Sequence, residues 1–181
     1  MCPDRVEITQ YIYLLKNEEI KMSGVTNMLN AKIKSPASID YVRELLNQGR
    51  PQDALKFIEH LGQKTPIMEN ARGVCLLRLG KIEQAISVLR EVVFQGYICI
   101  PSDTPVLYQI NFATAMLIAN LKDAAIPILD RLDVTEYPQA AKLKDAISRW
   151  AKSLNLIERF SYHLGLYPSK PVKIDFPPGE V

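Results

Sequence analysis

The sequence has few of the residues from which catalytic and metal sites are built. Its 181 residues include only three cysteines, two histidines and one tryptophan. The cysteines Cys2, Cys75 and Cys99 are far apart, and neither they nor His60 and His163 have the spacing of metal ligands. Phosphate-binding glycine loops, dinucleotide fingerprints and nucleophile elbows are also missing. The sequence therefore predicts a protein that is not an enzyme, with no catalytic residue, no metal and no cofactor.

Long apolar runs and a strong charge excess are absent as well. No apolar run approaches the roughly 20 residues that a membrane-spanning helix needs. The net charge is +2, and 23% of the residues are charged, so the chain creates no large field that would attract nucleic acid or an acidic membrane. The stretch MCPDRVEITQ lacks the build of a secretory signal, and the cysteines are scattered. We expect a cytoplasmic protein whose partners are neither nucleic acid nor membrane.

What the sequence does contain is a repeated order of helix starts and turns. A step from a hydroxyl or aromatic residue to proline opens a helical segment at Ser35-Pro36, Thr65-Pro66, Thr104-Pro105 and Tyr137-Pro138. A turn follows about fourteen residues later, at Gly49-Arg50, Gly80-Lys81, Asn120-Leu121 and Ser153-Leu154. Five residues after the first three turns stands a small residue followed by an apolar one: Ala54-Leu55, Ala85-Ile86 and Ala125-Ile126. Each unit is therefore expected to be two short helices packed around a turn.

Residues 65–93 form the clearest unit. Thr65 is placed to cap the first helix, and Pro66 fits its first turn, where a missing N–H costs nothing. Gly80 is expected to end that helix in the left-handed conformation. Ala85 is expected where the second helix presses closely on the first, and Cys75 as a small core residue.

This pattern resembles the tetratricopeptide repeat (TPR) family, whose unit is a helix-turn-helix of roughly 34 residues. The family's unit has four marked positions: a small residue, a turn residue, an alanine and a large apolar residue. In the second unit these are Gly73, Gly80, Ala85 and Leu89, and in the third Ala113, Asn120, Ala125 and Leu129. In the first unit Gly49, Ala54 and Ile58 agree, whereas Val42 stands at the small position. The chain departs from the pattern at the tryptophan position, which is Glu69 or Gln109, and at the tyrosine position, which is Leu76 or Met116. The resemblance covers residues 35–133 well and 138–165 weakly.

The resemblance implies an all-α fold, a right-handed α-α superhelix of about three to four helix-turn-helix repeats. We expect a single TPR-like domain over residues 1–165, with an N-terminal helical cap over 1–34 and an extended C-terminal tail over 166–181. The repeats are expected at about 35–62, 65–93, 104–133 and 138–165.

Four segments depart from a plain repeat. The apolar connection 94–103 is expected to fold back on the body, the alternative being a partner-binding loop. The segment 105–119 is apolar almost all round and should be a buried helix. Pro127 should bend the next helix or restrict it to a late start. In the tail, Val172, Ile174 and Phe176 alternate with charged residues, which suits an edge lying on a surface.

The family's concave side is lined by the first helices of successive units, and the resemblance carries its inward positions onto this chain. The expected groove residues are Ile39, Arg43 and Asn47 in the first unit, Asn70, Val74, Leu77 and Arg78 in the second, and Leu107, Ile110, Asn111, Thr114 and Leu117 in the third. Such a groove is apolar, with Arg43, Asn70, Arg78 and Asn111 left to orient a ligand. An exposed apolar groove is unusual on a monomer, so we expect it to be occupied by the N-terminal segment, by the tail, by a second copy in a homodimer, or by a partner.

These features predict a non-enzymatic protein–protein interaction module, or scaffold, that binds a peptide or helix in the groove. A narrower alternative resembles the TPR chaperones of secretion systems, which hold hydrophobic export substrates. An enzyme subunit and an RNA-binding helical repeat are the further alternatives.

Overall fold

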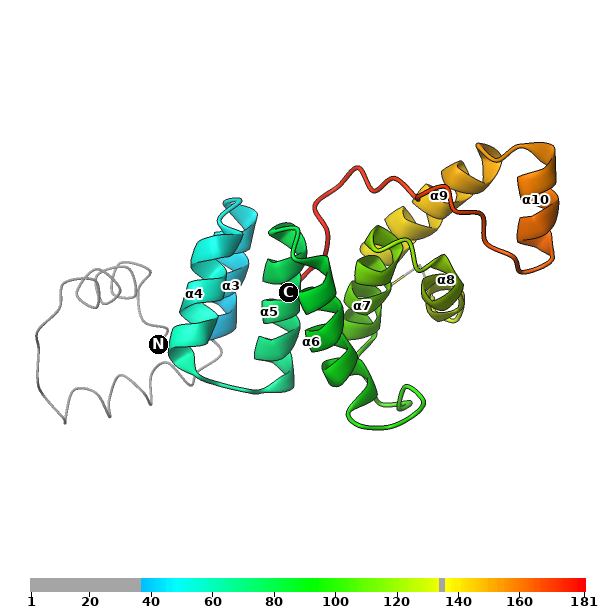
Figure 1. Ribbon diagram of the computed structural model, residues 1–181. Coiled ribbons are helices and arrows are strands. Elements are labelled where there is room, and N and C mark those ends of the chain that lie inside the picture. The colour runs from blue at the N-terminus through cyan, green and yellow to red at the C-terminus, as the bar shows by residue number, and fades with distance from the viewer. Residues whose placement is uncertain (1–36, 134–135) are drawn as a thin grey trace, which may run out of the picture. The chain divides into compact units, whose positions relative to one another are not determined.

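A computed structural model describes residues 37–133 and 136–181, all of which belong to one compact unit, Pro36–Val181. Every regular element in these two ranges is an α-helix, and they contain no strand (Figure 1). The prediction of an all-α fold is therefore confirmed for the described residues. The N-terminal cap expected over 1–34 lies outside them.

The helices come in four successive pairs. They are α3 (Ala37–Asn47) and α4 (Pro51–Leu61), α5 (Pro66–Arg78) and α6 (Ile82–Phe94), α7 (Val106–Ile118) and α8 (Lys122–Asp130), and α9 (Pro138–Lys152) and α10 (Leu156–His163). The two helices of each pair pack on each other, and α3 also contacts α5, α5 contacts α7, and α7 contacts α9 (Figure 1). The first helices of neighbouring pairs therefore touch in order along the chain.

Local chemistry sets the ends of α5 as the sequence predicts. The Thr65 hydroxyl accepts a hydrogen bond from the Met68 backbone N–H at 3.4 Å, and Pro66 occupies the first helical position. Gly80 follows the helix with φ of +73°, in the left-handed region. Between α5 and α6, Gly73 lies against Leu89 so closely that an added Cβ would be 2.5 Å from the leucine side chain. Only glycine lets these two helices approach this far.

The third pair supports one expectation and corrects another. In α7 every residue from 110 to 117 is buried, as its apolar sequence predicts. In α8 the expected late start is wrong, because the helix begins at Lys122 and continues through Pro127. In an uninterrupted helix residue 127 would donate its backbone N–H to the carbonyl of Asp123, and proline has no such N–H. Pro127 and Asp123 are both exposed, so water can bind that carbonyl instead. The buried side of α8 is left undisturbed.

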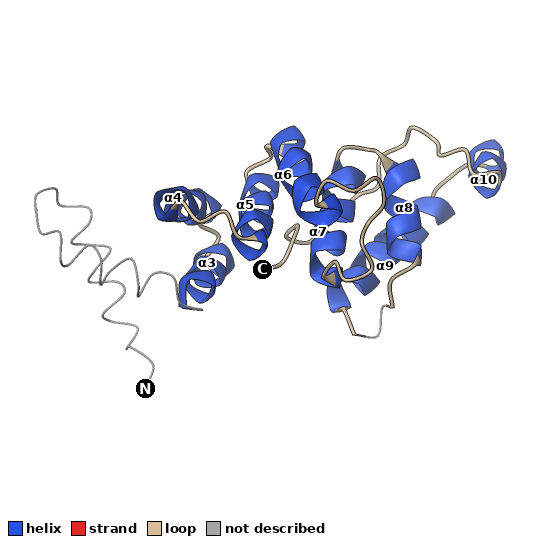
Figure 2. Cartoon of the chain, turned by 90° about the horizontal axis from the view of Figure 1, so that it is seen from below, coloured by secondary structure: helices blue, strands red, loops and turns tan. Residues whose placement is uncertain are grey.

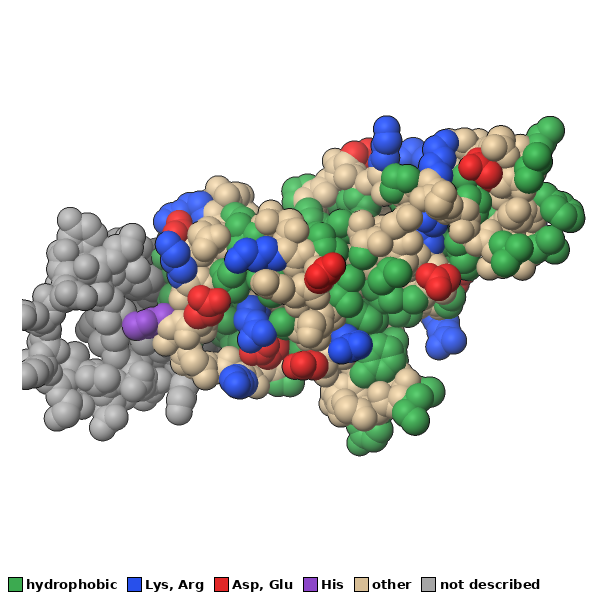
Figure 3. Space-filling model, viewed as in Figure 1, with side chains coloured by type: hydrophobic (Ala, Val, Ile, Leu, Met, Phe, Trp, Pro, Cys, Tyr) green, Lys and Arg blue, Asp and Glu red, His purple; other side chains and the backbone are tan. Residues whose placement is uncertain are grey.

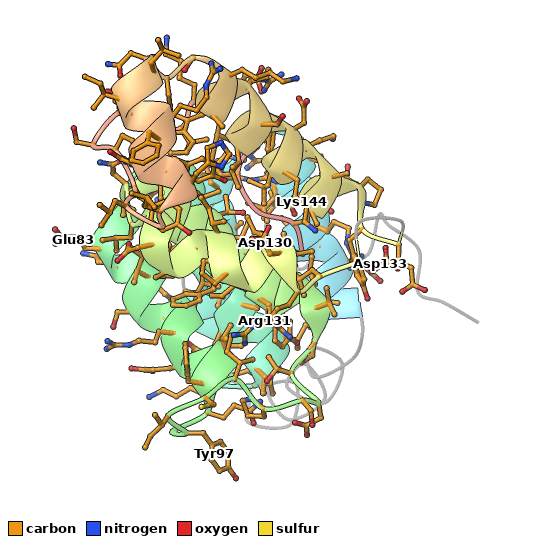
Figure 4. All side chains as sticks on the ribbon, turned by 90° about the vertical axis from the view of Figure 1, so that its right-hand side faces the viewer. Glu83, Tyr97, Asp130, Arg131, Asp133 and Lys144 are labelled. Carbon is orange, nitrogen blue, oxygen red and sulfur yellow. The ribbon has the colours of Figure 1, made fainter. Side chains whose placement is uncertain are left out.

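Two apolar segments are more exposed than the sequence suggests. In the connection 94–103, Phe94 packs edge-on against Phe112, but Tyr97 projects from the tip of the loop (Figure 4), and Ile98 is 98% exposed. The interpretation that this loop folds back on the body is therefore wrong for its tip. The second segment is α10, which has no buried residue, and its apolar side chains contribute to the hydrophobic surface at the right-hand end of the molecule in Figure 3. The exposed members there are Leu156, Ile157, Phe160, Leu164 and Leu166.

The tail, residues 166–181, has neither helix nor strand. It contacts the first helices of the pairs in reverse order, α9, α7, α5 and α3. Val172 is buried in the core, and Ile174 and Phe176 pack against it, whereas Lys173 and Asp175 are exposed. The alternation in the sequence thus matches one edge of the tail lying on the helices. The tail ends among α3, α5 and α7, where Figure 2 marks the C-terminus.

Candidate functional site

Residues 178–181 of the tail rest on a surface built from three helices. We call this surface the tail-binding face and define it by Arg43 of α3, Asn70, Val74 and Arg78 of α5, and Asn111 of α7. The three α5 residues are four positions apart, so they lie on one side of that helix. The face is therefore assembled from residues that the sequence separates by as many as 68 positions, from Arg43 to Asn111.

Arg78 binds the tail through two of its nitrogens. Its Nε donates to the carbonyl of Pro178 at 3.1 Å, and one terminal nitrogen donates to the carbonyl of Gly179 at 2.8 Å. The other terminal nitrogen donates to the carbonyl of Leu46 at the end of α3, also at 2.8 Å. One guanidinium thus ties α5, α3 and the tail together, which uses the fixed fork of donors that arginine has and lysine lacks.

Asn111 recognises both backbone groups of a single tail residue. Its amide nitrogen donates to the Glu180 carbonyl at 2.8 Å, and its amide oxygen accepts from the Glu180 N–H at 3.0 Å. The same nitrogen donates to the side-chain oxygen of Asn70 at 2.9 Å. Asn111 is 0% and Asn70 1% exposed, so both amides sit where an unpaired polar group would cost free energy. The tail backbone and Asn70 together satisfy Asn111.

Arg43 holds the last residue of the tail. Its Nε donates to the Val181 carbonyl at 2.6 Å, and another of its nitrogens pairs with Asp40 one turn earlier in α3. The pair with Asp40 helps to orient the guanidinium, and both side chains are largely exposed. This contact is expected to contribute less than those of Arg78 and Asn111.

Upstream anchors hold the rest of the tail near this face. Side chains of the last two helix pairs donate to tail carbonyls: the Asn120 amide to Ser169 at 2.9 Å and the Trp150 indole to Lys170 at 2.7 Å. Three side chains of the tail also make contacts. Lys170 donates to the Ser153 carbonyl, and Asp175 pairs with Arg149 of α9. The ring of Phe176 lies below the ammonium group of Lys142. The tail is thus fixed at several points between residues 169 and 181.

The electrostatics of the face keep Arg78 charged. Burial lowers the pKa of its guanidinium, and the nearby Cys75 and Glu180 act in the opposite direction. An arginine pKa starts so high that the side chain stays protonated. Burial also raises the pKa of the Cys75 thiol, to about 12, which leaves it a neutral core group. The face therefore offers the fixed positive charge of Arg78 beside that of Arg43, and no ionised nucleophile at Cys75.

The other predicted groove residues lie elsewhere. Four of them belong to the hydrophobic core: Ile39, Leu77, Ile110 and Leu117. Thr114 is fully buried, and its hydroxyl donates to the Ile110 carbonyl of its own helix. Leu107 is half-buried, and Asn47 is exposed. The structure thus brings the four polar residues that were expected to orient a ligand together on the face that the tail covers, and Val74 lies on the same face. The four are Arg43, Asn70, Arg78 and Asn111.

Sequence reasoning missed the upstream anchors Asn120, Arg149 and Trp150. On the charged side of α9, Arg149 pairs with Asp175 of the tail at 3.1 Å and with Asp145 of α9 at 3.1 Å. The alternating charges of the tail, Lys173 and Asp175, were the available signal that the tail meets a charged helix.

The described residues contain no candidate metal centre. No group of three or more histidine, cysteine or acidic side chains that could hold a metal occurs within 37–133 and 136–181. His60 and His163 are both exposed. In the same part of the chain, no helix has the length and apolar character needed to cross a membrane. The tail-binding face can bind a backbone through hydrogen bonds, and that is the chemistry its side chains supply.

Comparison with known proteins gives no relative for this chain: no family model, no curated protein and no solved structure matches it.

Proposed function

We propose that this chain is a non-enzymatic protein-interaction module that binds an extended peptide on its tail-binding face. The observation that carries the proposal is the pair of hydrogen bonds between Asn111 and the backbone of Glu180. A side chain that both donates to and accepts from one backbone residue selects an extended segment, because a helix has already used those groups internally.

The arrangement of the pairs supports a TPR-like right-handed superhelix as the scaffold. The first helices α3, α5, α7 and α9 contact one another in sequence order. In the TPR family these helices line the concave side. All five residues that define the tail-binding face come from α3, α5 and α7, which is where that family binds peptides.

The contacts indicate how such a module would select its ligand. Arg43, Arg78 and Asn111 form hydrogen bonds with backbone atoms of the tail and leave the Glu180 side chain exposed. Affinity would therefore come from the backbone, and the tail is a resident ligand that the chain carries itself. A peptide from outside would bind by displacing it.

A peptide-binding experiment tests the proposal. The receptor is the full-length chain with residues 177–181 all changed to serine, which we call the serine-tail variant. A fluorescent peptide with the sequence of residues 170–181 is titrated against it, and anisotropy is recorded. We expect saturable binding that is lost with the further change Asn111→Leu and kept with Asn47→Ala, an exposed asparagine of α3.

Circular dichroism of each variant separates loss of binding from loss of folding. If a folded serine-tail variant shows no saturable binding, the proposal is wrong.

A further inference from the structure

Gly179 occupies the most restricted position of the tail. It is buried, and its φ of +76° lies in the region that residues with side chains rarely adopt. A Cβ added there would lie 2.9 Å from Cγ2 of Val74, 3.0 Å from its Cγ1 and 3.3 Å from its Cβ. Two independent constraints, backbone conformation and contact, therefore both require glycine at this position.

Neither side of this contact is able to move away. Val74 is 0% exposed within the core, and a β-branched residue in a helix has one strongly preferred rotamer. The tail is held on both sides of the contact, because Arg78 binds the carbonyls of Pro178 and Gly179 and Asn111 binds Glu180. Lifting the tail to admit a side chain would break these hydrogen bonds.

The residues beside Gly179 also suit this face. Pro177 and Pro178 have no N–H to satisfy and a fixed φ, so the segment loses little conformational freedom when it binds. The face supplies a donor, Arg78, for the Pro178 carbonyl. Its acceptor, the Asn111 side-chain oxygen, binds the N–H of Glu180, which follows the two prolines and Gly179. The Glu180 carboxylate attracts the Arg78 guanidinium.

We propose that Val74 makes the tail-binding face selective for glycine, so that its ligand is an extended Pro-Gly segment of another protein, for which residues 178–180 of the tail are the built-in competitor. This inference rests on the proposed function and adds the ligand class and the residue that sets it. The tail of a second copy would make the same contacts as the chain's own tail without its covalent link. Because a linked segment acts at an effective concentration on the order of millimolar, an identical unlinked tail has no means to displace it. A partner segment gains such means from contacts outside 178–180.

The test compares peptides on the serine-tail variant, with and without the further change Val74→Ala. Two peptides are used: the sequence of residues 170–181, and the same sequence with alanine at the position of Gly179. We expect the alanine peptide to bind about 100-fold more weakly when Val74 is present, since both the left-handed backbone and the clash oppose it. With Val74→Ala the difference should fall to about tenfold, because only the backbone strain remains. A purely structural role of Val74 would change the affinity of both peptides by the same factor.

Each outcome has one meaning. If the two peptides bind the serine-tail variant equally well, glycine selectivity is refuted and the proposed function stands. If neither peptide binds the folded variant, the proposed function fails, and this inference fails with it. The source of the ligand is tested on the unmodified chain by light scattering and by hydrogen exchange of the Glu180 amide. If the mass doubles as the concentration rises and the exchange slows with it, the ligand is the tail of a second copy. That result would overturn the assignment to another protein. If Val74→Ala fails to fold, Val74→Cys, which is smaller and lacks the β-branch, replaces it.

Discussion

Replacing Arg78 by lysine tests whether hydrogen-bond geometry, and not charge alone, holds the tail in place. Arg78 donates to the carbonyls of Pro178 and Gly179 and to that of Leu46. A lysine ammonium keeps the positive charge, but a single nitrogen cannot span these three acceptors. We expect Arg78→Lys to weaken docking of the tail while the helices stay folded.

The size of the effect follows from the bonds that are lost. Lysine retains at most one of the two bonds to the tail, so at least one charge-assisted hydrogen bond disappears, which is worth about 1.5–3 kcal/mol. Since 1.36 kcal/mol corresponds to a factor of ten, the population of the released tail should rise about 10- to 150-fold. The side chain is half-buried, and solvent screening favours the lower part of this range.

Amide hydrogen exchange measures this release directly. The Glu180 N–H donates to Asn111 Oδ1 only while the tail is docked, so its protection should fall by the predicted factor. The matched control is Arg72→Lys on the same helix, where the side chain pairs with Glu69 at 3.0 Å and should leave the Glu180 amide unchanged.

Two results would refute the reasoning for Arg78→Lys. One is a change in Glu180 protection of less than about threefold, which would mean that the guanidinium bonds contribute little. The other is an equal loss of protection at Val74 in the middle of α5, which would mean that the helices and not the tail depend on Arg78.

Three further predictions concern the helices themselves. Gly73→Ala should destabilise the chain by about 1–3 kcal/mol in urea unfolding, because its Cβ would lie 2.5 Å from Leu89; a neutral result would show that the helices separate easily. Cys75, whose pKa burial raises from 9.0 to about 12, should resist alkylation at pH 8 while exposed Cys99 reacts, and equal rates would contradict its burial. Because the folded pKa of Cys75 is the higher one, its contribution to stability is complete below about pH 9 and is lost as the pH rises toward 12. Gln139→Met should raise the free energy of unfolding by about 1 kcal/mol, since the buried Gln139 amide has no hydrogen-bond partner among the described residues, and a loss of stability would show that it has one.

Much of the fold could be predicted because its signals are local. The Thr65 cap, the Pro66 start and the left-handed Gly80 act within one turn of the backbone, so the sequence alone places the ends of α5. The same holds for the buried sequence of α7. The late start expected from Pro127 was wrong because the effect of a proline is not local: it depends on whether water reaches the carbonyl that loses its hydrogen bond, and that depends on what covers the helix.

The candidate site was predicted in part. The TPR resemblance named Arg43, Asn70, Arg78 and Asn111 as polar groups of one surface, and all four contact the tail or a residue that does. It also named Ile110 and Leu117, which are in the core. A helical pattern gives the side on which a residue lies, but the boundary between groove and core depends on how closely the neighbouring helices approach.

The sequence by itself determined where α5 begins and ends, that the helices come in pairs, and that residues 166–181 form no helix, because capping, glycine turns and proline act through the nearest backbone groups. Only the tertiary structure decided that the tail lies on α3, α5 and α7, that Asn111 meets Asn70 and Glu180, and that α10 keeps its apolar residues exposed. These outcomes depend on contacts between residues as much as 138 positions apart, as between Arg43 and Val181, and nothing in the local sequence specifies which distant surface a segment will meet.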